Sequence, residues 1–199
     1  VSPQGGDFSE PVTQNTKRYV RTFWGLDRAL AYARHFPSIN WLTSYSEYAA
    51  DLKPWYDANV SPDFVPCRNK ISNLLQEESS LMEIVKLIGA DILPEDQKLV
   101  IETAKLIRVG FLQQNAYHDI DTYVPLEKQL KMMQVILRLY NGARALIARS
   151  IPLSQLRATG IFETLTKIKY EIANDQLEKF AEYDALVDEA LDTVDKANR

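Results

Sequence analysis

The chain has 199 residues, of which 46% are hydrophobic and 25% are charged. This composition is typical of a globular protein with one large domain or two small ones, and it excludes disordered, collagen-like and low-complexity chains. The formal net charge of −4 disfavours non-specific nucleic-acid binding, which needs a positive excess. A single cysteine, Cys67, excludes a disulfide framework and a multi-thiolate metal site.

The N-terminal residues have neither a basic region nor an apolar core, so they do not form a signal peptide. No uninterrupted apolar run is long enough to cross a membrane. The sequence begins with turn residues and without an initiator methionine. We therefore expect it to be part of a longer polypeptide.

Apolar spacing predicts helices along most of the first third of the chain. After an N-terminal loop, we expect a helix over about residues 13–34. An aromatic-rich turn should follow, because Pro37 biases Phe36 away from helical geometry. A short helix is expected near residues 46–52, ending before Pro54.

Apolar spacing in the rest of the chain predicts further helices, which are separated by proline or glycine. The clearest amphipathic pattern covers residues 65–89, where apolar residues recur at three- and four-residue steps. Further helices are expected over about residues 94–117, 125–149, 152–172 and 175–197. Since strand signals are nearly absent, we predict an all-α fold with a helical bundle.

The last segment, residues 174–199, carries eight acidic and three basic residues. Such a charge excess is typical of the solvated face of a terminal helix, and the alternative is an acidic interaction surface.

The usual catalytic motifs are missing from this sequence. It contains neither the GxxxxGK[ST] phosphate loop nor GxGxxG. His35 and His118 are isolated and do not form a metal-binding pattern, and Cys67 lacks a context that would activate it. We therefore predict no catalytic residues and no metal ligands within this chain.

Two aromatic and amide-rich segments could hold a planar base. Phe36-Pro37 is one, and the segment from Gln113 to Tyr117 is the other. Aromatic side chains offer stacking faces, and the neighbouring amides offer hydrogen-bond donors and acceptors. The alternative interpretation is helix capping together with core aromatics.

Several longer runs of the sequence form a further pattern. They are GGDFSEPVTQNT (5–16), FWGLD (23–27), RHFPSINWLTSYS (34–46), LLQEE (74–78), EIV (83–85), FLQQNAY (111–117) and DTY (121–123). Together these runs resemble the catalytic A subunit of archaeal- and vacuolar-type ATPases. They occur in that family's order and spacing between about residues 5 and 140, and beyond Leu153 only a helical pattern remains.

The resemblance implies a helical bundle over residues 61–199, preceded by the C-terminal edge of a nucleotide-binding domain over residues 1–60. It also implies that Phe36 and Pro37 lie beside the adenine of a bound nucleotide. The other wall of this adenine site would comprise Gln113, Gln114, Asn115, Ala116 and Tyr117.

By analogy with the related F-type beta subunit, the resemblance places a rotor-facing loop between two long helices. Its residues are Asp91, Ile92, Leu93, Pro94, Glu95 and Asp96. The loop would transmit closure of the nucleotide site as a helix movement. The alternative is a well-capped helix–helix connection.

In the complete family subunit, ATP or ADP binds with Mg through a phosphate loop and acidic residues upstream of this region. The resemblance therefore implies a part of an ATPase or ATP synthase that couples ATP hydrolysis or synthesis to proton or sodium transport. We expect this chain alone to be inactive and to hold no nucleotide.

The resemblance also implies the partners. These are B subunits alternating with A subunits in the ATPase head, and the central rotor stalk. We expect no nucleic acid, no direct membrane insertion and a cytoplasmic location, peripheral to the membrane through the complex. Self-association of the chain through its uncovered face is a further expectation. The alternative is a free-standing helical interaction or adaptor module without nucleotide chemistry.

Two departures from the family pattern concern the expected adenine wall. Val109-Gly110 stands where the family usually has an acidic pair, and Tyr117 stands where phenylalanine is commoner. Glycine weakens a helix by roughly 1 kcal/mol relative to alanine, and the departures concern fine details of the adenine wall and not the family itself.

Overall fold

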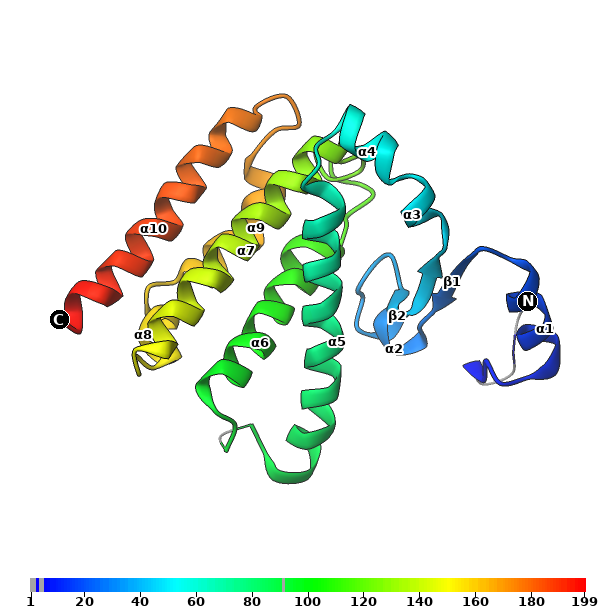
Figure 1. Ribbon diagram of the computed structural model, residues 1–199, viewed down its shortest axis with the longest axis horizontal. Coiled ribbons are helices and arrows are strands. Elements are labelled where there is room, and N and C mark those ends of the chain that lie inside the picture. The colour runs from blue at the N-terminus through cyan, green and yellow to red at the C-terminus, as the bar shows by residue number, and fades with distance from the viewer. Residues whose placement is uncertain (1–2, 4–5, 91) are drawn as a thin grey trace. The chain divides into compact units, whose positions relative to one another are not determined.

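The computed structural model describes residues 3, 6–90 and 92–199. The chain divides into two compact units, residues 1–65 and 66–199 (Figure 1). The position of one unit relative to the other is not determined.

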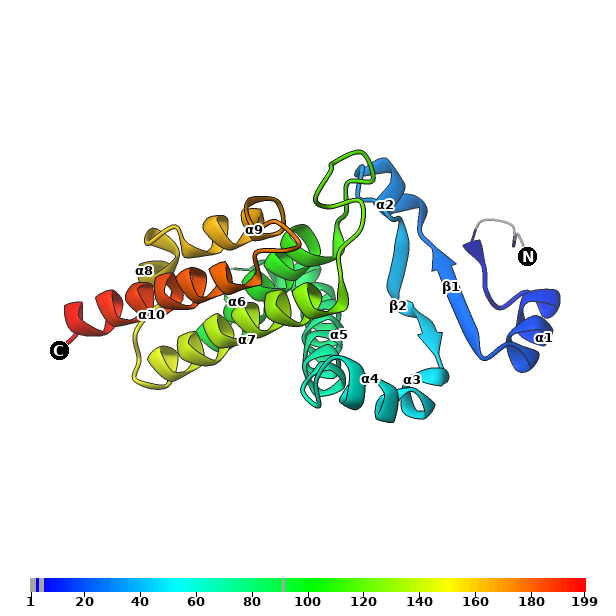
Figure 2. The same cartoon turned by 90° about the horizontal axis from the view of Figure 1, so that it is seen from above.

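The first unit is built around a two-stranded antiparallel ribbon (Figure 2). Glu10 begins helix α1, because its carboxylate accepts a hydrogen bond from the backbone N–H of Thr13 at 3.0 Å. Strand β1 pairs with β2 from Thr22 opposite Ser46 to Leu26 opposite Ile39. The elements are α1 (Pro11–Tyr19), β1 (Thr22–Leu26), α2 (Arg28–Tyr32), β2 (Ile39–Ser46), α3 (Tyr48–Asp51) and α4 (Lys53–Asn59).

The ribbon shows that the expected helix over residues 13–34 is wrong, because β1 occupies the middle of that range. The pairing involves a segment about twenty residues away, which local periodicity does not detect. Phe23 stacks on Tyr45 with 5.9 Å between ring centroids, and the Tyr45 hydroxyl donates to the Lys17 carbonyl at 3.2 Å. These contacts favour a strand over a continued helix.

The short helix expected near residues 46–52 is also only partly right. Helix α3 covers Tyr48–Asp51, and α4 follows almost directly and contains Pro54 in its first turn. Proline is accepted there because the first helical N–H groups have no intrahelical partner. Pro54 therefore begins a second helix instead of only ending the first.

The second unit is a bundle of helices. Helix α7 lies alongside α10 and α6, and α9 packs on α6 and on the π-helix η2 (Figure 1). The elements are α5 (Phe64–Ile88), α6 (Glu95–Leu106), η2 (Ile107–Leu112), α7 (Leu126–Ala148), α8 (Leu153–Ala158), α9 (Ile161–Glu171), the 3₁₀-helix η3 (Leu177–Lys179) and α10 (Phe180–Ala197).

The core of this unit consists of aliphatic side chains from several helices. Removing such a side chain from water contributes about 1.5–3 kcal/mol to folding. The most deeply buried aliphatic side chains include Leu99, Ile107, Ile136, Leu139, Leu165 and Val187.

The all-α prediction is confirmed for the bundle, and the long helices α5 and α7 lie within one residue of their expected bounds. Two other expectations differ. The helix expected over residues 94–117 changes to a π-helix at Ile107 and ends at Leu112. The helix expected over residues 152–172 is divided at Gly160, whose left-handed φ of 76° separates α8 from α9.

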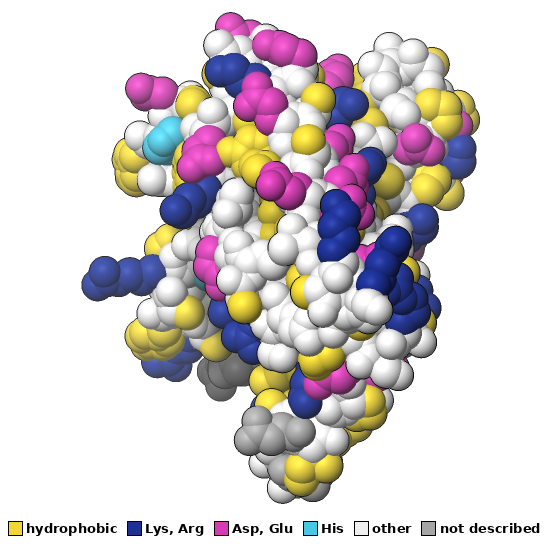
Figure 3. All heavy atoms as spheres, turned by 90° about the vertical axis from the view of Figure 1, so that its left-hand side faces the viewer, with side chains coloured by type: hydrophobic (Ala, Val, Ile, Leu, Met, Phe, Trp, Pro, Cys, Tyr) yellow, Lys and Arg dark blue, Asp and Glu magenta, His cyan; other side chains and the backbone are white. Residues whose placement is uncertain are grey.

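The acidic residues of α10 are partly neutralised by the neighbouring helix α7. Arg138 donates to Asp188 at 2.8 Å, and Arg149 pairs with Asp195. Figure 3 shows acidic and basic side chains interspersed on the face at the left of Figure 1. This mixture is typical of a solvated helix face, and the acidic interaction surface stays the alternative interpretation.

Candidate functional site

The candidate site lies in the connection between η2 and α7, residues 113–125. The side chain of Asn115 accepts the backbone N–H of Tyr117 at 3.0 Å, which forms a local turn. The His118 carbonyl accepts from the N–H groups of Asp121 at 3.0 Å and Thr122 at 2.9 Å. These bonds give the connection a defined shape although it has no regular secondary structure.

Asp121 fixes this connection from the inside. Its side chain is buried, and its carboxylate accepts the backbone N–H of Asn115 at 2.6 Å. Its backbone carbonyl accepts the side-chain amide of Gln114 at 2.7 Å. A single residue therefore binds both the backbone and a side chain of the expected adenine wall.

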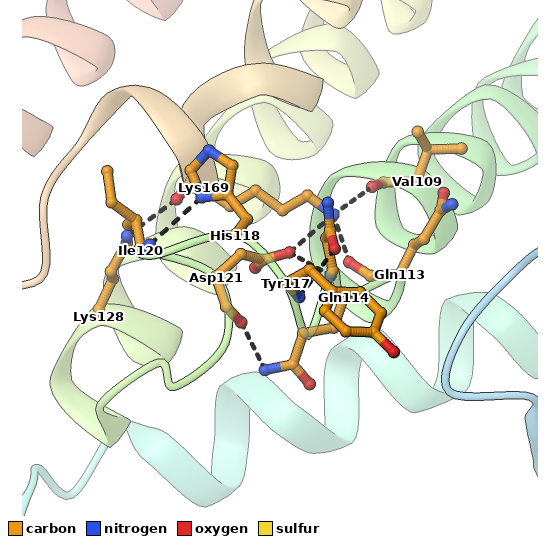
Figure 4. A network of polar contacts seen from close by, with 10 residues as sticks. Val109, Gln113, Gln114, Tyr117, His118, Ile120, Asp121, Lys128 and Lys169 are labelled. Carbon is orange, nitrogen blue, oxygen red and sulfur yellow. Dashed lines mark hydrogen bonds and ion pairs between the residues drawn. The ribbon is translucent and has the colours of Figure 1, made fainter.

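Lys169 of α9 reaches the same connection and is only 2% exposed. Its ammonium donates to the carbonyls of Val109, at 3.1 Å, and Gln113, and it lies 4.0 Å from the Asp121 carboxylate (Figure 4). The last carbonyls of a helix have no partner within that helix, and a cation there is favoured by the helix dipole. Lys169 therefore caps the end of η2.

Lys128 of α7 plays the same part for α9 and is fully buried. Its ammonium donates to the carbonyls of Lys169 at 2.9 Å and Ile172 at 2.6 Å, and to the Asn174 side chain at 3.0 Å. Asn174 in turn donates to the carbonyls of Ile120 and Tyr123 in the connection. Lys128 thus joins α7 to the end of α9, and Lys169 joins α9 to the end of η2.

The electrostatic environment of the cluster is set mainly by burial. Burial lowers the pKa of both Lys128 and Lys169, and the nearby Asp121 carboxylate partly opposes this change. Burial also raises the pKa of Tyr170, whose ring centroid lies 4.8 Å from the Lys169 ammonium, and Asp121 adds to that effect. Asp121, Lys128 and Lys169 are all buried and hold the connection in place by hydrogen bonds, so none of the three is an exposed acid or base.

The expected wall residues Gln113–Tyr117 lie together on this connection. Gln113 and Gln114 are half-buried, and Asn115, Ala116 and Tyr117 are exposed. The Tyr117 side chain is 97% exposed. Since the amides of Gln114 and Asn115 make the internal bonds described above, the aromatic ring is the group most available to a ligand.

Phe36 and Pro37 lie in the first unit, between α2 and β2. Phe36 is 51% exposed, and the preceding His35 is buried, with its ring 5.6 Å from that of Trp41. Asp27 fixes this turn by accepting the side-chain amide of Asn40 at 2.8 Å. The distance from this turn to Tyr117 is not determined, because the two residues belong to different units.

The expected rotor-facing loop is partly buried and partly exposed. Asp91 lies outside the described residues. Ile92, Pro94 and Asp96 are exposed, whereas Leu93 is buried. The Glu95 carboxylate accepts the backbone N–H of Leu153 at 2.7 Å and the Lys98 ammonium at 3.0 Å. Glu95 therefore joins the start of α6 to the start of α8 and does not cap the connection between α5 and α6, whose N-cap residue Pro94 makes no side-chain hydrogen bond.

Sequence reasoning missed Lys128, Lys169 and Asp121, although a signal was present for the lysines. Lys128 lies four residues before the buried Met132, and Lys169 lies four residues after the buried Leu165. Each lysine thus falls on the apolar face of its helix, where a charge is kept only if it is paired or hydrogen-bonded.

Within the described residues, no three histidine, cysteine, aspartate or glutamate side chains come together as a metal site. In the same part of the chain, no helix is long and apolar enough to cross a membrane.

The comparison with known families agrees with the helical fold of residues 66–199. Residues 53–157 match the C-terminal domain of V and A type ATP synthase, and residues 1–46 match the nucleotide-binding domain of the ATP synthase alpha/beta family. The chain therefore belongs to the V- and A-type ATP synthase family. Within that family it corresponds to the C-terminal portion of the alpha, or A, subunit.

Three relatives illustrate the similarity. The V-type ATP synthase alpha chain 2 of Clostridium tetani is 57% identical over 89% of this chain and 30% of its own length. The V-type ATP synthase alpha chain of Halothermothrix orenii is 52% identical, over 95% and 32% respectively. The A subunit of the A-type ATP synthase of Methanosarcina acetivorans is 51% identical, over 86% and 30%.

The chain thus spans about a third of the length of these relatives. The predicted family is confirmed, and the alternative of a free-standing adaptor module is not favoured.

Proposed function

We propose that this chain acts as the C-terminal portion of the catalytic subunit of a rotary ATP synthase or ATPase. In the complete subunit it would help couple ATP hydrolysis or synthesis to proton or sodium transport. The names of the relatives support this role. The observation that carries the proposal is the connection over residues 113–125, which is fixed by buried polar groups while the Tyr117 ring is exposed.

An exposed, well-supported aromatic ring is suited to stacking on a planar base. Stacking of this kind contributes about 1–3 kcal/mol, which orients a base without binding a whole nucleotide tightly. In this proposal Gln113–Tyr117 form one wall of the adenine site, and Phe36 and Pro37 form the other. Residues 1–60 are the edge of the nucleotide-binding domain, and residues 61–199 are the bundle.

The phosphates and Mg would be held by other parts of the complete subunit. The chain would contact B subunits in the head, and the exposed Ile92 and Asp96 would face the central rotor stalk. Its location would be cytoplasmic and peripheral to the membrane. The direction of the reaction and the transported ion would be set elsewhere in the complex.

The test is the Tyr117→Ala substitution in the complete subunit, assembled into the ATPase head. We expect the KM for ATP to rise by about 5- to 150-fold, as loss of a stacking contact predicts. Tyr117→Phe should retain the parent KM, because it keeps the ring. The matched control is Tyr123→Ala, which removes a 75% exposed ring from the same connection. An unchanged KM in Tyr117→Ala would contradict the proposed role of this wall.

A further inference from the structure

We infer that Lys169 is a positioning residue for the nucleotide site, acting through the conformation of Gln113–Tyr117. This inference rests on the proposed function of that segment. It assigns a role to α9, which lies beyond residues 53–157 that match the family's C-terminal domain. Lys169 does not touch the expected ligand surface, because its side chain is 2% exposed.

The first step of the argument is the end of η2. The carbonyl of Val109 lies in its last turns and that of Gln113 directly follows its end, where carbonyls have no partner within the helix and need donors from outside it. The Lys169 ammonium supplies both bonds (Figure 4). Since Gln113 is the first residue of the expected wall, the position of Lys169 sets where the wall begins.

The second step is the middle of the wall. Asp121 lies 4.0 Å from the Lys169 ammonium and accepts the N–H of Asn115 at 2.6 Å. A buried carboxylate needs a nearby cation or donors, and Lys169 is the cation within ion-pair distance of it, with Lys128 adding a weaker electrostatic contribution. Lys169 therefore holds Gln113 directly and supports the group that holds Asn115, two residues before Tyr117.

The third step is that Lys169 is itself held firmly. Gly110 brings η2 against α9, because a Cβ atom on it would lie 3.2 Å from the backbone of Thr166. The carbonyl of Lys169 accepts the Lys128 ammonium at 2.9 Å. These contacts fix the backbone of α9 at Lys169, from which the side chain reaches the wall.

The test compares Lys169→Met with the parent in the complete subunit, assembled into the ATPase head. Methionine keeps an unbranched apolar stem of similar size and removes the donors. We expect the KM for ATP to rise about fivefold or more, the lower end of the effect of a stacking contact. The kcat should remain within about twofold, because the reacting phosphates are bound elsewhere. The control is Lys167→Met, which removes an exposed lysine from the same helix.

A second pair of variants covers the case in which Lys169→Met does not assemble. Asp121→Ala removes the acceptor for the Asn115 N–H and should raise the KM for ATP. Asp121→Asn retains an acceptor oxygen and should restore most of the parent KM. A merely structural role would lower the yield of assembled head without this separation between KM and kcat.

The outcomes distinguish the inference from the proposed function. If Tyr117→Ala raises the KM but Lys169→Met and Asp121→Ala do not, the positioning role is wrong and the adenine wall stands. If none of these variants changes the KM, the proposed wall fails and the inference fails with it. A loss of kcat at unchanged KM in Lys169→Met would also overturn the inference.

Discussion

Burying two lysines near one aspartate is costly unless their donors are satisfied. A protonated lysine has three N–H donors, and the Lys128 ammonium meets three acceptors at 2.6–3.0 Å. Lys169 meets two carbonyls and the Asp121 carboxylate. Nearly all of these acceptors belong to helix ends or turns. The two ammonium groups therefore supply hydrogen-bond donors to backbone carbonyls at helix ends inside the bundle. Without these donors the carbonyls would be buried without a partner.

Gly110 provides a residue-scale prediction about packing. An alanine Cβ there would lie 3.2 Å from the Thr166 Cα atom and 3.4 Å from the Leu165 carbonyl, so the backbone of α9 would have to move. Overpacking costs about 1–3 kcal/mol, and the helix preference of alanine offsets up to about 1 kcal/mol of it. We expect Gly110→Ala to lower the free energy of unfolding by about 1–2 kcal/mol, measured by urea denaturation.

The matched control is Gly142→Ala in α7. The new Cβ would lie 2.2 Å from one Leu191 Cδ atom and 3.2 Å from its Cγ atom, so this half-buried side chain, and no backbone atom, would have to move to another rotamer. The cost of that movement and the helix preference of alanine should nearly cancel, leaving a change within about 0.5 kcal/mol. Equal losses in the two variants would contradict the close approach of η2 and α9.

The buried lysines are residues of the candidate site that could not be predicted from the sequence. The aromatic and amide residues of the wall were recognisable from their types and from the family resemblance. Lys169 was not, because lysine is usually exposed and its partners lie 56 and 60 residues away in the sequence. No local pattern connects Lys169 with the carbonyl of Gln113.

At the scale of elements, Glu95 joins the beginnings of two helices. It lies in the first turn of α6, and its carboxylate accepts the N–H of Leu153 at the start of α8. This bond, together with the one from Lys98, lowers the pKa of Glu95. A carboxylate here satisfies an N–H group that α8 cannot satisfy within itself.

A pH-dependent prediction follows from the lowered pKa. Because the folded state favours the ionised carboxylate, its contribution is fully present above about pH 4.3, the ordinary glutamate value, and is lost as pH falls through the lower folded value. Glu95→Gln should therefore reduce the free energy of unfolding by about 1 kcal/mol at pH 7, a figure that allows for the partial exposure of the side chain. The same comparison at pH 3 should show a smaller difference.

Urea unfolding of both chains at the two pH values measures this change. Glu77→Gln, an exposed substitution in the middle of α5, serves as the control and should show little difference at either pH. A loss in Glu95→Gln that is as large at pH 3 as at pH 7 would mean that the carboxylate charge is not what joins the two helices.

Helices specified by neighbouring residues could be predicted from the sequence, whereas a strand specified by a distant partner could not. Helices α5 and α7 were predicted almost to the residue, since a single apolar stripe and proline or glycine at the ends specify them. Strand β1 was read as helix, because its partner strand lies beyond the window of periodicity. The division at Gly160 was missed, since a glycine inside an apolar pattern is compatible with both a continuous and an interrupted helix.

At the scale of the whole molecule, the two units make different contributions to the proposed site. The first unit carries Phe36 and Pro37, and the second carries Gln113–Tyr117. Each segment is fixed by its own unit, through Asp27 and Asn40 in one and Asp121 and Lys169 in the other.

Base contacts alone set an upper limit on the affinity of this chain for ATP. Stacking contributes about 1–3 kcal/mol, whereas a Kd of 1 mM corresponds to about 4.1 kcal/mol. The sequence has no GxxxxGK[ST] run to bind the phosphates. We therefore expect isothermal titration of the chain alone with Mg-ATP to give a Kd weaker than millimolar. Tyr117→Ala should weaken any residual binding further, and the complete subunit should bind far more tightly. A micromolar Kd for the chain alone would mean that these residues hold the phosphates as well as the base, and the division of labour proposed here would be wrong.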